Sequence, residues 1–140
     1  MPIESLARSD VVTAREDEPV QDLATRMEES KVGSVVITDG DEPIGIVTDR
    51  DLATRVIGDG MDPAETTAAD VMSDDLTTVD ETDGFYRATE LMSEHGIRRL
   101  PITNDSNELV GIITSDDLTE LLAEEQMQLS DVIQAQRPEH

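Results

Sequence analysis

An internal repeat constrains this chain more than any other feature of its sequence. The octapeptide GIVTDRDL at residues 45–52 returns as GIITSDDL at residues 111–118, 66 positions later in a chain of 140 residues. The flanking segments match as well, since residues 12–38 align with 77–103 at an offset of 65, mostly at apolar positions. A sequence that repeats at this spacing indicates two copies of one supersecondary unit. Any site that the unit builds is therefore expected twice.

Both copies predict the same order of elements, which is strand, helix, strand, strand, helix. In the first copy we expect strands at 11–13, 34–38 and 44–48, a helix capped by Asp17 or Glu18, and a helix over 49–57. In the second copy we expect strands at 76–79, 99–103 and 109–114, and helices at 83–94 and 115–124. Halves of about 60 residues bury little surface alone, so the two copies are expected to share a core.

The domain organisation follows from the repeat and from a polar, turn-rich stretch between its copies. We expect the first repeat over residues 1–60, a linker over 61–67, the second repeat over 68–124, and a helical tail over 125–140. In the tail, Leu129, Val132 and Ile133 are spaced to form a short apolar stripe on one helical face.

The charge of the chain excludes whole classes of partner. Its 33 Asp and Glu against 10 Lys and Arg give a formal net charge of -23, which repels nucleic acid and anionic membranes. Lys31 is the only lysine. An acidic, lysine-poor composition resembles that of proteins from halophilic microbes, where about 1 M salt shortens the screening length to about 3 Å. An acidic disordered chain is the alternative, but periodic blocks of Ile, Leu and Val argue against it.

Several residue types are absent, and their absence limits the chemistry that we expect. The chain has no cysteine, so a disulfide framework and a thiolate metal site are excluded. No apolar run approaches the roughly 20 residues of a membrane span, and the N-terminus lacks the features of a signal peptide. We therefore expect a cytoplasmic protein. Without a catalytic triad, a histidine cluster or a P-loop, we expect no enzyme activity, no metal site and no required cofactor.

The repeated octapeptide places a hydroxyl and a carboxylate together where a strand passes into a helix. Thr48 and Asp51 do so in the first copy, and Thr114 and Asp117 do so in the second. Backbone N–H groups at such a position suit a phosphate, and a carboxylate accepts hydrogen bonds from a ribose diol. The alternative is a capping box, in which the two side chains only satisfy donors of the helix itself. The duplication with identical flanking residues favours the ligand site.

Both octapeptides resemble the adenosyl-ligand signature of CBS domains, named after cystathionine β-synthase. The resemblance covers nearly the whole chain, including RRLPIT at 98–103 and ADVMSDDLTTV at 69–79. Two such repeats form a Bateman module. The resemblance implies a mixed α/β (α+β) fold of two β-α-β-β-α repeats, related by a pseudo-two-fold axis and packed through their sheets. It also implies two clefts that bind AMP, ADP, ATP, S-adenosylmethionine or related ligands.

The same resemblance assigns roles to the residues of each octapeptide. Asp51 and Asp117 match the family acid that accepts hydrogen bonds from the ribose hydroxyls. Thr48 and Thr114 match the hydroxyl that contacts ribose or phosphate.

Four further positions match residues that line the cleft in this family. Thr13 and Thr78 stand at the ends of the first strands, and Ile46 and Ile112 match an apolar wall beside the base. Ordinary strand-end or core packing is the alternative for each of them.

Arginines near the repeats are candidate phosphate ligands, because a guanidinium offers paired donors to a phosphate. Arg98 and Arg99 precede a strand where related modules, such as the gamma subunit of AMP-activated kinase, hold phosphates with basic residues. Arg50, within the first octapeptide, could join them. Ion pairing with the abundant carboxylates is the alternative.

The basic residues are not duplicated. Gly33 and Ser34 stand where the second copy has its arginine pair, and Asp116 stands where the first copy has Arg50. The two clefts are therefore expected to differ in their preference for charged ligands.

Two functional readings remain open. The first is a stand-alone regulatory module that binds an adenosine-containing ligand and signals to a partner protein whose identity the sequence does not reveal. The second is a ligand-free interaction or dimerisation module, in which the Thr-x-x-Asp motifs are helix caps. Since the modules of this family commonly pair through helices, a homodimer is expected in either case.

Overall fold

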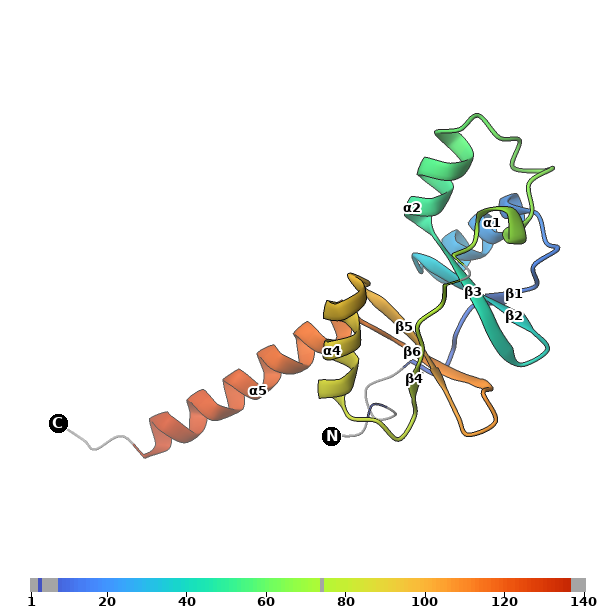
Figure 1. The fold of residues 1–140 in the computed structure, drawn as a ribbon. Helices are drawn as coiled ribbons and strands as arrows, with labels where there is room; N and C mark the ends of the chain where they lie inside the picture. The colour runs from blue at the N-terminus through green and yellow to red at the C-terminus, as the bar shows by residue number, and fades with distance from the viewer. Residues whose placement is uncertain (1–2, 4–7, 74, 137–140) are drawn as a thin grey trace.

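Two three-stranded sheets of the same topology form the centre of the molecule (Figure 1). The computed structural model describes residues 3, 8–73 and 75–136, so the ends of the expected first repeat and of the tail lie outside the described residues. The first sheet contains β1 (Thr13–Ala14), β2 (Ser34–Asp39) and β3 (Glu42–Thr48), and the second contains β4 (Val79–Asp80), β5 (Arg99–Thr103) and β6 (Leu109–Thr114). In each sheet the first strand pairs parallel and the third antiparallel with the middle strand.

The pairing register shows that the duplication extends to three dimensions. Val36 pairs with Ile46 in the first sheet, and Pro101 pairs with Ile112 in the second, at equivalent positions of the repeat. Each antiparallel pair also has an irregularity at the equivalent place, after Ile37 and after Ile102. Since register is set by which side chains must face the core, the two copies bury the same faces.

The helices follow the predicted order with three differences in detail. They are α1 (Val20–Ser30), α2 (Asp49–Asp51) continued by the π-helix η2 (Leu52–Ile57), α3 (Ala68–Val71), α4 (Phe85–His95) and α5 (Ser115–Ala135). The first difference is the π-helical geometry of η2. The second is the length of α5, which continues past Glu124 without a break and projects away from the sheets (Figure 1).

The third difference concerns the start of α1, where the expectation of an Asp17 or Glu18 cap was wrong. Pro19 is the N-cap residue and no side chain caps the helix. Glu18 is occupied elsewhere, because it accepts hydrogen bonds from the guanidinium of Arg26 and from the backbone N–H of Arg15. These bonds, led by that of Arg26, hold the pKa of Glu18 below its ordinary value.

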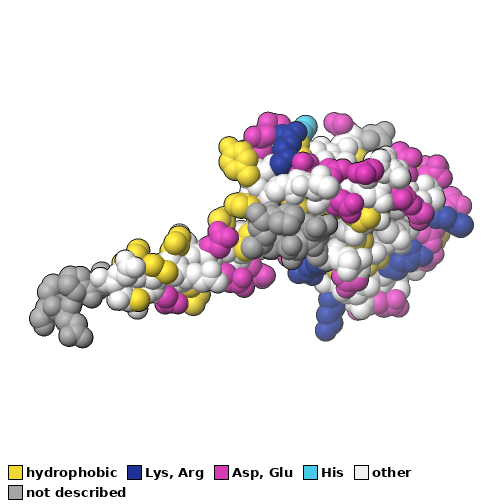
Figure 2. Space-filling model, turned by 90° about the horizontal axis from the view of Figure 1, so that it is seen from below, with side chains coloured by type: hydrophobic (Ala, Val, Ile, Leu, Met, Phe, Trp, Pro, Cys, Tyr) yellow, Lys and Arg dark blue, Asp and Glu magenta, His cyan; other side chains and the backbone are white. Residues whose placement is uncertain are grey.

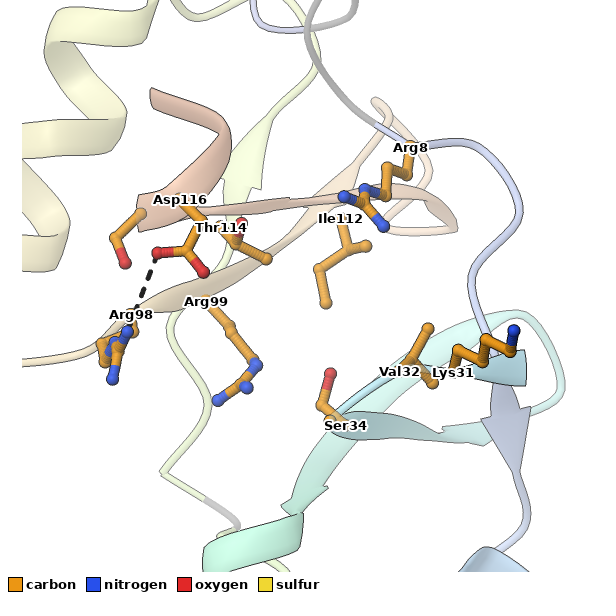
Figure 3. Close-up of a pocket in the computed structure, with 11 residues that line it drawn as sticks. Arg8, Lys31, Val32, Ser34, Arg98, Arg99, Ile112, Thr114 and Asp116 are labelled. Carbon is orange, nitrogen blue, oxygen red and sulfur yellow. Dashed lines mark ion pairs between the residues drawn. The ribbon is translucent and has the colours of Figure 1, made fainter. Parts of the chain in front are cut away.

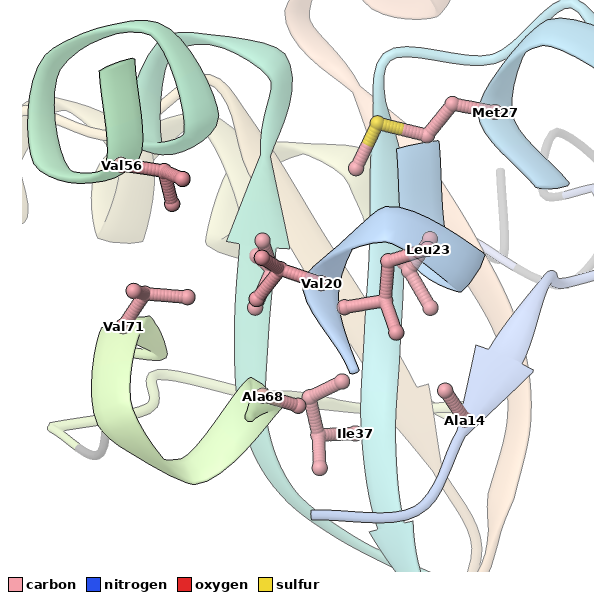
Figure 4. Close-up of a cluster of buried hydrophobic side chains, with 10 residues drawn as sticks. Ala14, Val20, Leu23, Met27, Ile37, Val56, Ala68 and Val71 are labelled. Atoms are coloured by element: carbon pink, nitrogen blue, oxygen red, sulfur yellow. The ribbon is translucent and has the colours of Figure 1, made fainter. Parts of the chain in front are cut away.

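The two halves have separate hydrophobic cores, which corrects the expectation of one shared core. One cluster includes Leu23, Ile37 and Val71 (Figure 4), and the other includes Leu100 and Ile113. Alternate strand residues point to opposite faces, so each sheet uses one face for its own helices and keeps the other face free for its partner.

The second face of each sheet is buried between the two halves. Val36 and Pro101, the equivalent residues in the middle strands, are both fully buried, yet neither belongs to one of the two core clusters. They alternate with the residues that point into the clusters. The halves therefore meet through their sheets, as the resemblance implies.

The segment before the first strand of each repeat packs against the other repeat, and this exchange ties the halves together. Ala68 belongs to the first cluster and donates its N–H to the carbonyl of Glu18 at 2.9 Å. Ile3 belongs to the second cluster and donates its N–H to the carbonyl of Asp83 at 3.0 Å. Because each segment completes the core of the opposite half, neither repeat is complete without the other.

The first glycine of the first octapeptide, Gly45, lies where the segment before β4 packs against β3. A Cβ at Gly45 would lie 2.6 Å from Sδ of Met72 and 3.1 Å from the carbonyl oxygen of Ser73. The residue after it, Ile46, exchanges two backbone hydrogen bonds with Ser73. The glycine therefore lets the segment before the second repeat lie against β3.

Candidate functional site

Two clefts lie at the junction of the halves, and each contains one octapeptide. Cleft 1 contains the first octapeptide, has a volume of about 210 Å³ and is lined by Ile46, Thr48, Asp51, Ser73, Asp75, Leu76, Thr77, Ile97, Arg98 and Arg99. Cleft 2 contains the second, has a volume of about 190 Å³ and is lined by Arg8, Lys31, Val32, Gly33, Ser34, Arg98, Arg99, Ile112, Thr114, Ser115 and Asp116 (Figure 3). Their similar size means that charge, rather than volume, distinguishes them.

The backbone beside the two clefts is equivalent. Ile46 in cleft 1 forms an antiparallel bridge with Ser73, and Ile112 in cleft 2 forms the same bridge with Arg8. Ser73 and Arg8 are separated by 65 positions, the offset of the repeat. The predicted apolar wall residues thus lie in the clefts, each beside the segment that crosses from the other half.

Thr48 and Asp51 form a reciprocal capping box. Oγ1 of Thr48 accepts the N–H of Asp51 at 3.2 Å, and Oδ2 of Asp51 accepts the N–H of Thr48 at 2.9 Å. Thr114 and Asp117 repeat both bonds at 3.2 and 3.0 Å. The capping alternative from the sequence is therefore realised in both copies.

Capping uses only one oxygen of each carboxylate. Oδ1 of Asp51 has Nε of Arg55 3.9 Å away, on the next turn of the same helix. Oδ1 of Asp117 has a guanidinium nitrogen of Arg8 3.5 Å away, from the other half of the molecule. Since an ionised carboxylate has about four acceptor positions, the cap orients the carboxylate and leaves one oxygen for another partner.

A third Thr-x-x-Asp motif shows what the cap does without a cleft. Asp70 accepts the N–H of Thr67 at 2.9 Å through its Oδ2, at the start of α3. No glycine-initiated strand precedes this motif, and Asp70 is exposed and lines neither cleft. A Thr-x-x-Asp capping box by itself is thus only a helix start, and its position at a strand end distinguishes the two octapeptides.

Arg98 and Arg99, the predicted phosphate ligands, line both clefts. Arg98 directly precedes β5 and Arg99 is its first residue. Arg98 is largely exposed and has a guanidinium nitrogen 3.7 Å from Oδ1 of Asp116. Arg99 passes close to Gly33, where a Cβ would lie 2.8 Å from its guanidinium nitrogen. The glycine that replaces an arginine in the first copy therefore leaves the space that Arg99 occupies.

Four other predicted residues line neither cleft among the described residues. One of them is Asp117, whose Oδ1 lies 3.5 Å from a guanidinium nitrogen of Arg8, a residue that does line cleft 2. Arg50 is exposed and lines neither cleft. Thr13 and Thr78 also line neither cleft, whereas Thr77 lines cleft 1. Neighbouring residues of an extended segment point to opposite sides, so a prediction that is wrong by one position selects a side chain that points away from the cleft.

Two residues of cleft 2 were missed by the sequence analysis. Arg8 lies before the first strand of its repeat, and only its alignment with Ser73 could have drawn attention to it. Lys31 was noted for its rarity, yet its position directly before Val32 and Gly33 could have placed it beside the arginines of the other copy.

The electrostatic balance of the clefts differs sharply. Cleft 1 has Arg98 and Arg99 against the carboxylates of Asp51 and Asp75. Cleft 2 has four cations against the carboxylate of Asp116, with Asp117 beside Arg8. This concentration of positive charge is found in a chain whose visible surface is rich in carboxylates (Figure 2).

Other kinds of site find less support in the described part of the chain. There, no three side chains of His, Asp or Glu are grouped so that they could hold a metal ion. Nor does any helix within it combine the length and the apolar character needed to cross a membrane.

Comparison with known proteins identifies both halves. The CBS domain model matches residues 3–58 and 68–124. A protein of Methanopyrus kandleri is 44% identical over 117 residues, which cover 83% of this chain and 60% of the relative, so this chain spans about three fifths of that protein's length.

Two solved structures have the same fold. A protein with CBS domains from Burkholderia ambifaria has a TM-score of 0.81 and 26% identity, covering 90% of this chain and 96% of its own. A CBS domain protein from Pyrobaculum aerophilum, complexed with AMP, has a TM-score of 0.78 and 27% identity, covering 84% and 90%.

Proposed function

This chain belongs to the CBS domain family, and we propose that it is a regulatory module that binds adenosine-containing ligands in its two clefts. The observation that carries the proposal is the capping geometry of Asp51 and Asp117. In each carboxylate, Oδ2 accepts the backbone N–H of the capping threonine, while Oδ1 takes no part in the cap. A preorganised acceptor of this kind suits the two hydroxyl groups of a ribose.

The remaining cleft residues fit the other parts of a nucleotide. Ile46 and Ile112 offer apolar surface to a base, and Arg98 and Arg99 offer charge-assisted hydrogen bonds to a phosphate. The AMP complex of the related protein from P. aerophilum supports AMP as a ligand, with ADP, ATP and S-adenosylmethionine as further candidates. The proposed role is regulatory and non-catalytic, with the bound state read by a partner protein.

The ligand proposal is tested by thermal unfolding in molar KCl with AMP, ADP, ATP and S-adenosylmethionine. A ligand at about 100 times its dissociation constant should stabilise the fold by about 2.7 kcal/mol. The matched control ligand is 2′,3′-dideoxy-AMP, which keeps the base and phosphate but lacks the hydroxyls that Asp51 and Asp117 would accept. An unchanged melting temperature with the whole panel at millimolar concentration would contradict the proposal and favour the ligand-free interaction module.

We further propose a homodimer that forms through α5. Leu122, Leu129, Val132 and Ile133, here called the apolar stripe, are 48 to 63% exposed. Leu122, Leu129 and Ile133 are seven and four residues apart, so they share one helical face.

The positions of the acidic residues on α5 favour a second copy of the chain, rather than a basic protein, as the partner of the apolar stripe. Glu120, Glu124 and Asp131 are offset from Leu122 or Leu129 by two residues, which is about 200° around the helix. Glu125 is the acidic residue that lies within the face of the stripe, next to Leu129 and Val132. Two chains of charge -23 can therefore join their stripes while their acidic faces point apart. A basic partner would instead be expected to find acidic residues along both edges of the stripe.

The acidic composition supports a protein that works in concentrated salt. At about 1 M salt the screening length is about 3 Å, so repulsion between the surface carboxylates is strongly reduced. The proposed division of the chain remains two repeats, a linker over 61–67 and a helical tail.

A further inference from the structure

We infer that the two clefts divide adenine nucleotides by their number of phosphates, an inference that rests on the proposed function. Cleft 2 takes a nucleoside diphosphate or triphosphate. Cleft 1 takes a nucleoside with one phosphate or none. The basis is that Arg8 and Lys31 line only cleft 2, whereas Arg98 and Arg99 are common to both.

Lys31 occupies a backbone position that normally favours glycine. It ends α1 in the left-handed region with φ 55°, and its equivalent in the other repeat, Gly96, ends α4 with φ 63°. A side chain in this conformation costs about 1 kcal/mol relative to glycine. The only lysine of the chain thus stands at a strained position, and that position places it at cleft 2 (Figure 3). Strain of this kind is characteristic of functional positions.

Arg8 also replaces a neutral residue of the other copy. It takes the place of Ser73 in the backbone bridge, so two hydrogen bonds to Ile112, at 3.1 and 3.0 Å, hold its backbone beside cleft 2. Its guanidinium lies 3.5 Å from Oδ1 of Asp117, the oxygen that a ribose would need. A ribose that binds Asp117 must compete with this cation, and a phosphate that binds Arg8 removes the competition. Phosphates and ribose are therefore recognised together in cleft 2.

Cleft 1 lacks this coupling. Among the described residues, Arg55 is the one cation within 4.0 Å of its ribose acceptor, Asp51, at 3.9 Å, and Arg55 does not line the cleft. Asp75 places a carboxylate in the lining and opposes additional phosphates. Adenosine should thus find its acceptor accessible in cleft 1.

Counter-ions are abundant in this chain, yet the cations of cleft 2 are incompletely neutralised. Carboxylates outnumber Lys and Arg by 33 to 10. Within the described residues, neither Lys31 nor Arg99 has a carboxylate oxygen within 4.0 Å. The carboxylate of Asp49 approaches the same point beside Gly33 as the guanidinium of Arg99, without forming an ion pair with it within 4.0 Å. Lys31 and Arg99 together therefore provide a site for an anion with several charges.

Isothermal titration calorimetry with adenosine, AMP, ADP and inorganic pyrophosphate tests the inference. The variant is R8Q with K31Q, and the control is R15Q with R87Q, which removes the same charge from exposed ion pairs away from both clefts. ADP should bind the variant about tenfold or more weakly than the wild type, because charged hydrogen bonds to phosphate are lost. Adenosine should bind the variant no more weakly than the wild type, because the variant keeps cleft 1 and loses the cation that competes for Asp117, and the control should match the wild type with every ligand. Pyrophosphate should bind more weakly than ADP, because it has no ribose for Asp117.

The outcomes separate this inference from the proposed function. If adenosine and AMP bind but the variant and the control bind ADP equally well, the division between the clefts is wrong and the proposed function stands. Equal affinity for pyrophosphate and ADP would also contradict nucleotide recognition in cleft 2. If no adenine compound binds the wild type, the proposed function fails, and the inference fails with it.

Discussion

Thr48 and Asp51 hold each other through two hydrogen bonds that leave Oδ1 of Asp51 outside the cap. From the sequence, a helix cap and a ligand site were alternative interpretations of these residues. The cap is present, and it fixes the orientation of the carboxylate. Capping and ribose recognition are therefore compatible in the same residue, and Thr114 with Asp117 repeats the arrangement.

Replacement of Asp51 and Asp117 by asparagine separates the two roles. The side-chain oxygen of an asparagine can still accept a hydrogen bond from the backbone N–H of the capping threonine. Its NH₂ group, which replaces Oδ1, cannot accept a hydrogen bond from a ribose hydroxyl. We expect D51N with D117N to abolish most of the AMP-induced rise in melting temperature, while the free energy of unfolding without ligand falls by about 1 kcal/mol per site or less. D70N is the matched control, since Asp70 caps a helix outside both clefts. A full AMP response in the double variant would show that the acids serve only as caps.

Gly45→Ala should destabilise the fold by about 1 to 3 kcal/mol, because the added methyl overpacks the crossing of the two halves. It would meet Sδ of Met72 at 2.6 Å and the backbone carbonyl of Ser73 at 3.1 Å. Gly33→Ala is the comparison, because there the nearest atoms are the mobile ends of Arg99 and Asp49. Chemical denaturation should show a clear loss for the first variant and a small change for the second. Equal losses would argue against a special role for Gly45.

Glu18→Gln should destabilise the protein by about 1 to 2 kcal/mol at pH 7, since Arg26 loses a partly buried charged partner. Because hydrogen bonds from Arg26 and Arg15 lower the pKa of Glu18, its contribution is complete above the ordinary glutamate pKa and is lost as pH falls through the lower folded-state value. The difference between wild type and variant should thus shrink below about pH 4.5. Glu16→Gln, which removes an exposed carboxylate, should cause little change at any pH. A difference that persists at pH 3 would contradict the assignment.

The melting temperature should rise as KCl increases from 0.1 to 2 M, because salt screens the repulsion within a chain of charge -23. Each kcal/mol gained corresponds to about 4 °C in a domain of this size. The variant E28Q with E29Q removes two exposed charges from α1 and should show a smaller dependence on KCl. A melting temperature that is independent of KCl would contradict the interpretation of the acidic surface.

Leu129→Gln with Ile133→Gln should convert the proposed dimer into a monomer, as measured by sedimentation equilibrium in molar KCl. Both side chains lie on the apolar stripe and are more than 60% exposed. Met127→Gln is the control, because Met127 is 68% exposed but lies five residues from Leu122, on another face of α5. A wild-type chain that is monomeric at high micromolar concentration would rule out pairing through the stripe.

The sequence predicted the repeat, the order of elements and the two octapeptide sites because these features depend on local and periodic patterns. Strands 99–103 and 109–114 coincide with β5 and β6, since their apolar and β-branched residues are bounded by the polar residues Arg98, Asn104, Glu108 and Ser115. Short strands were placed less accurately. The strand expected at 11–13 is β1 at Thr13–Ala14. Because the strand ends were misplaced, Thr13 and Thr78 were predicted to line the clefts, which they do not.

By itself, the sequence determined that this protein is a pair of CBS repeats with a duplicated Thr-x-x-Asp site. Only the tertiary structure decided which oxygen of each carboxylate stays clear of its cap, and which cations surround each cleft. Arg8, Lys31 and Arg99 lie far apart in the chain and meet only where the two halves join. Charge in a cleft is a sum over segments brought together by packing, so no local pattern in the sequence could reveal it.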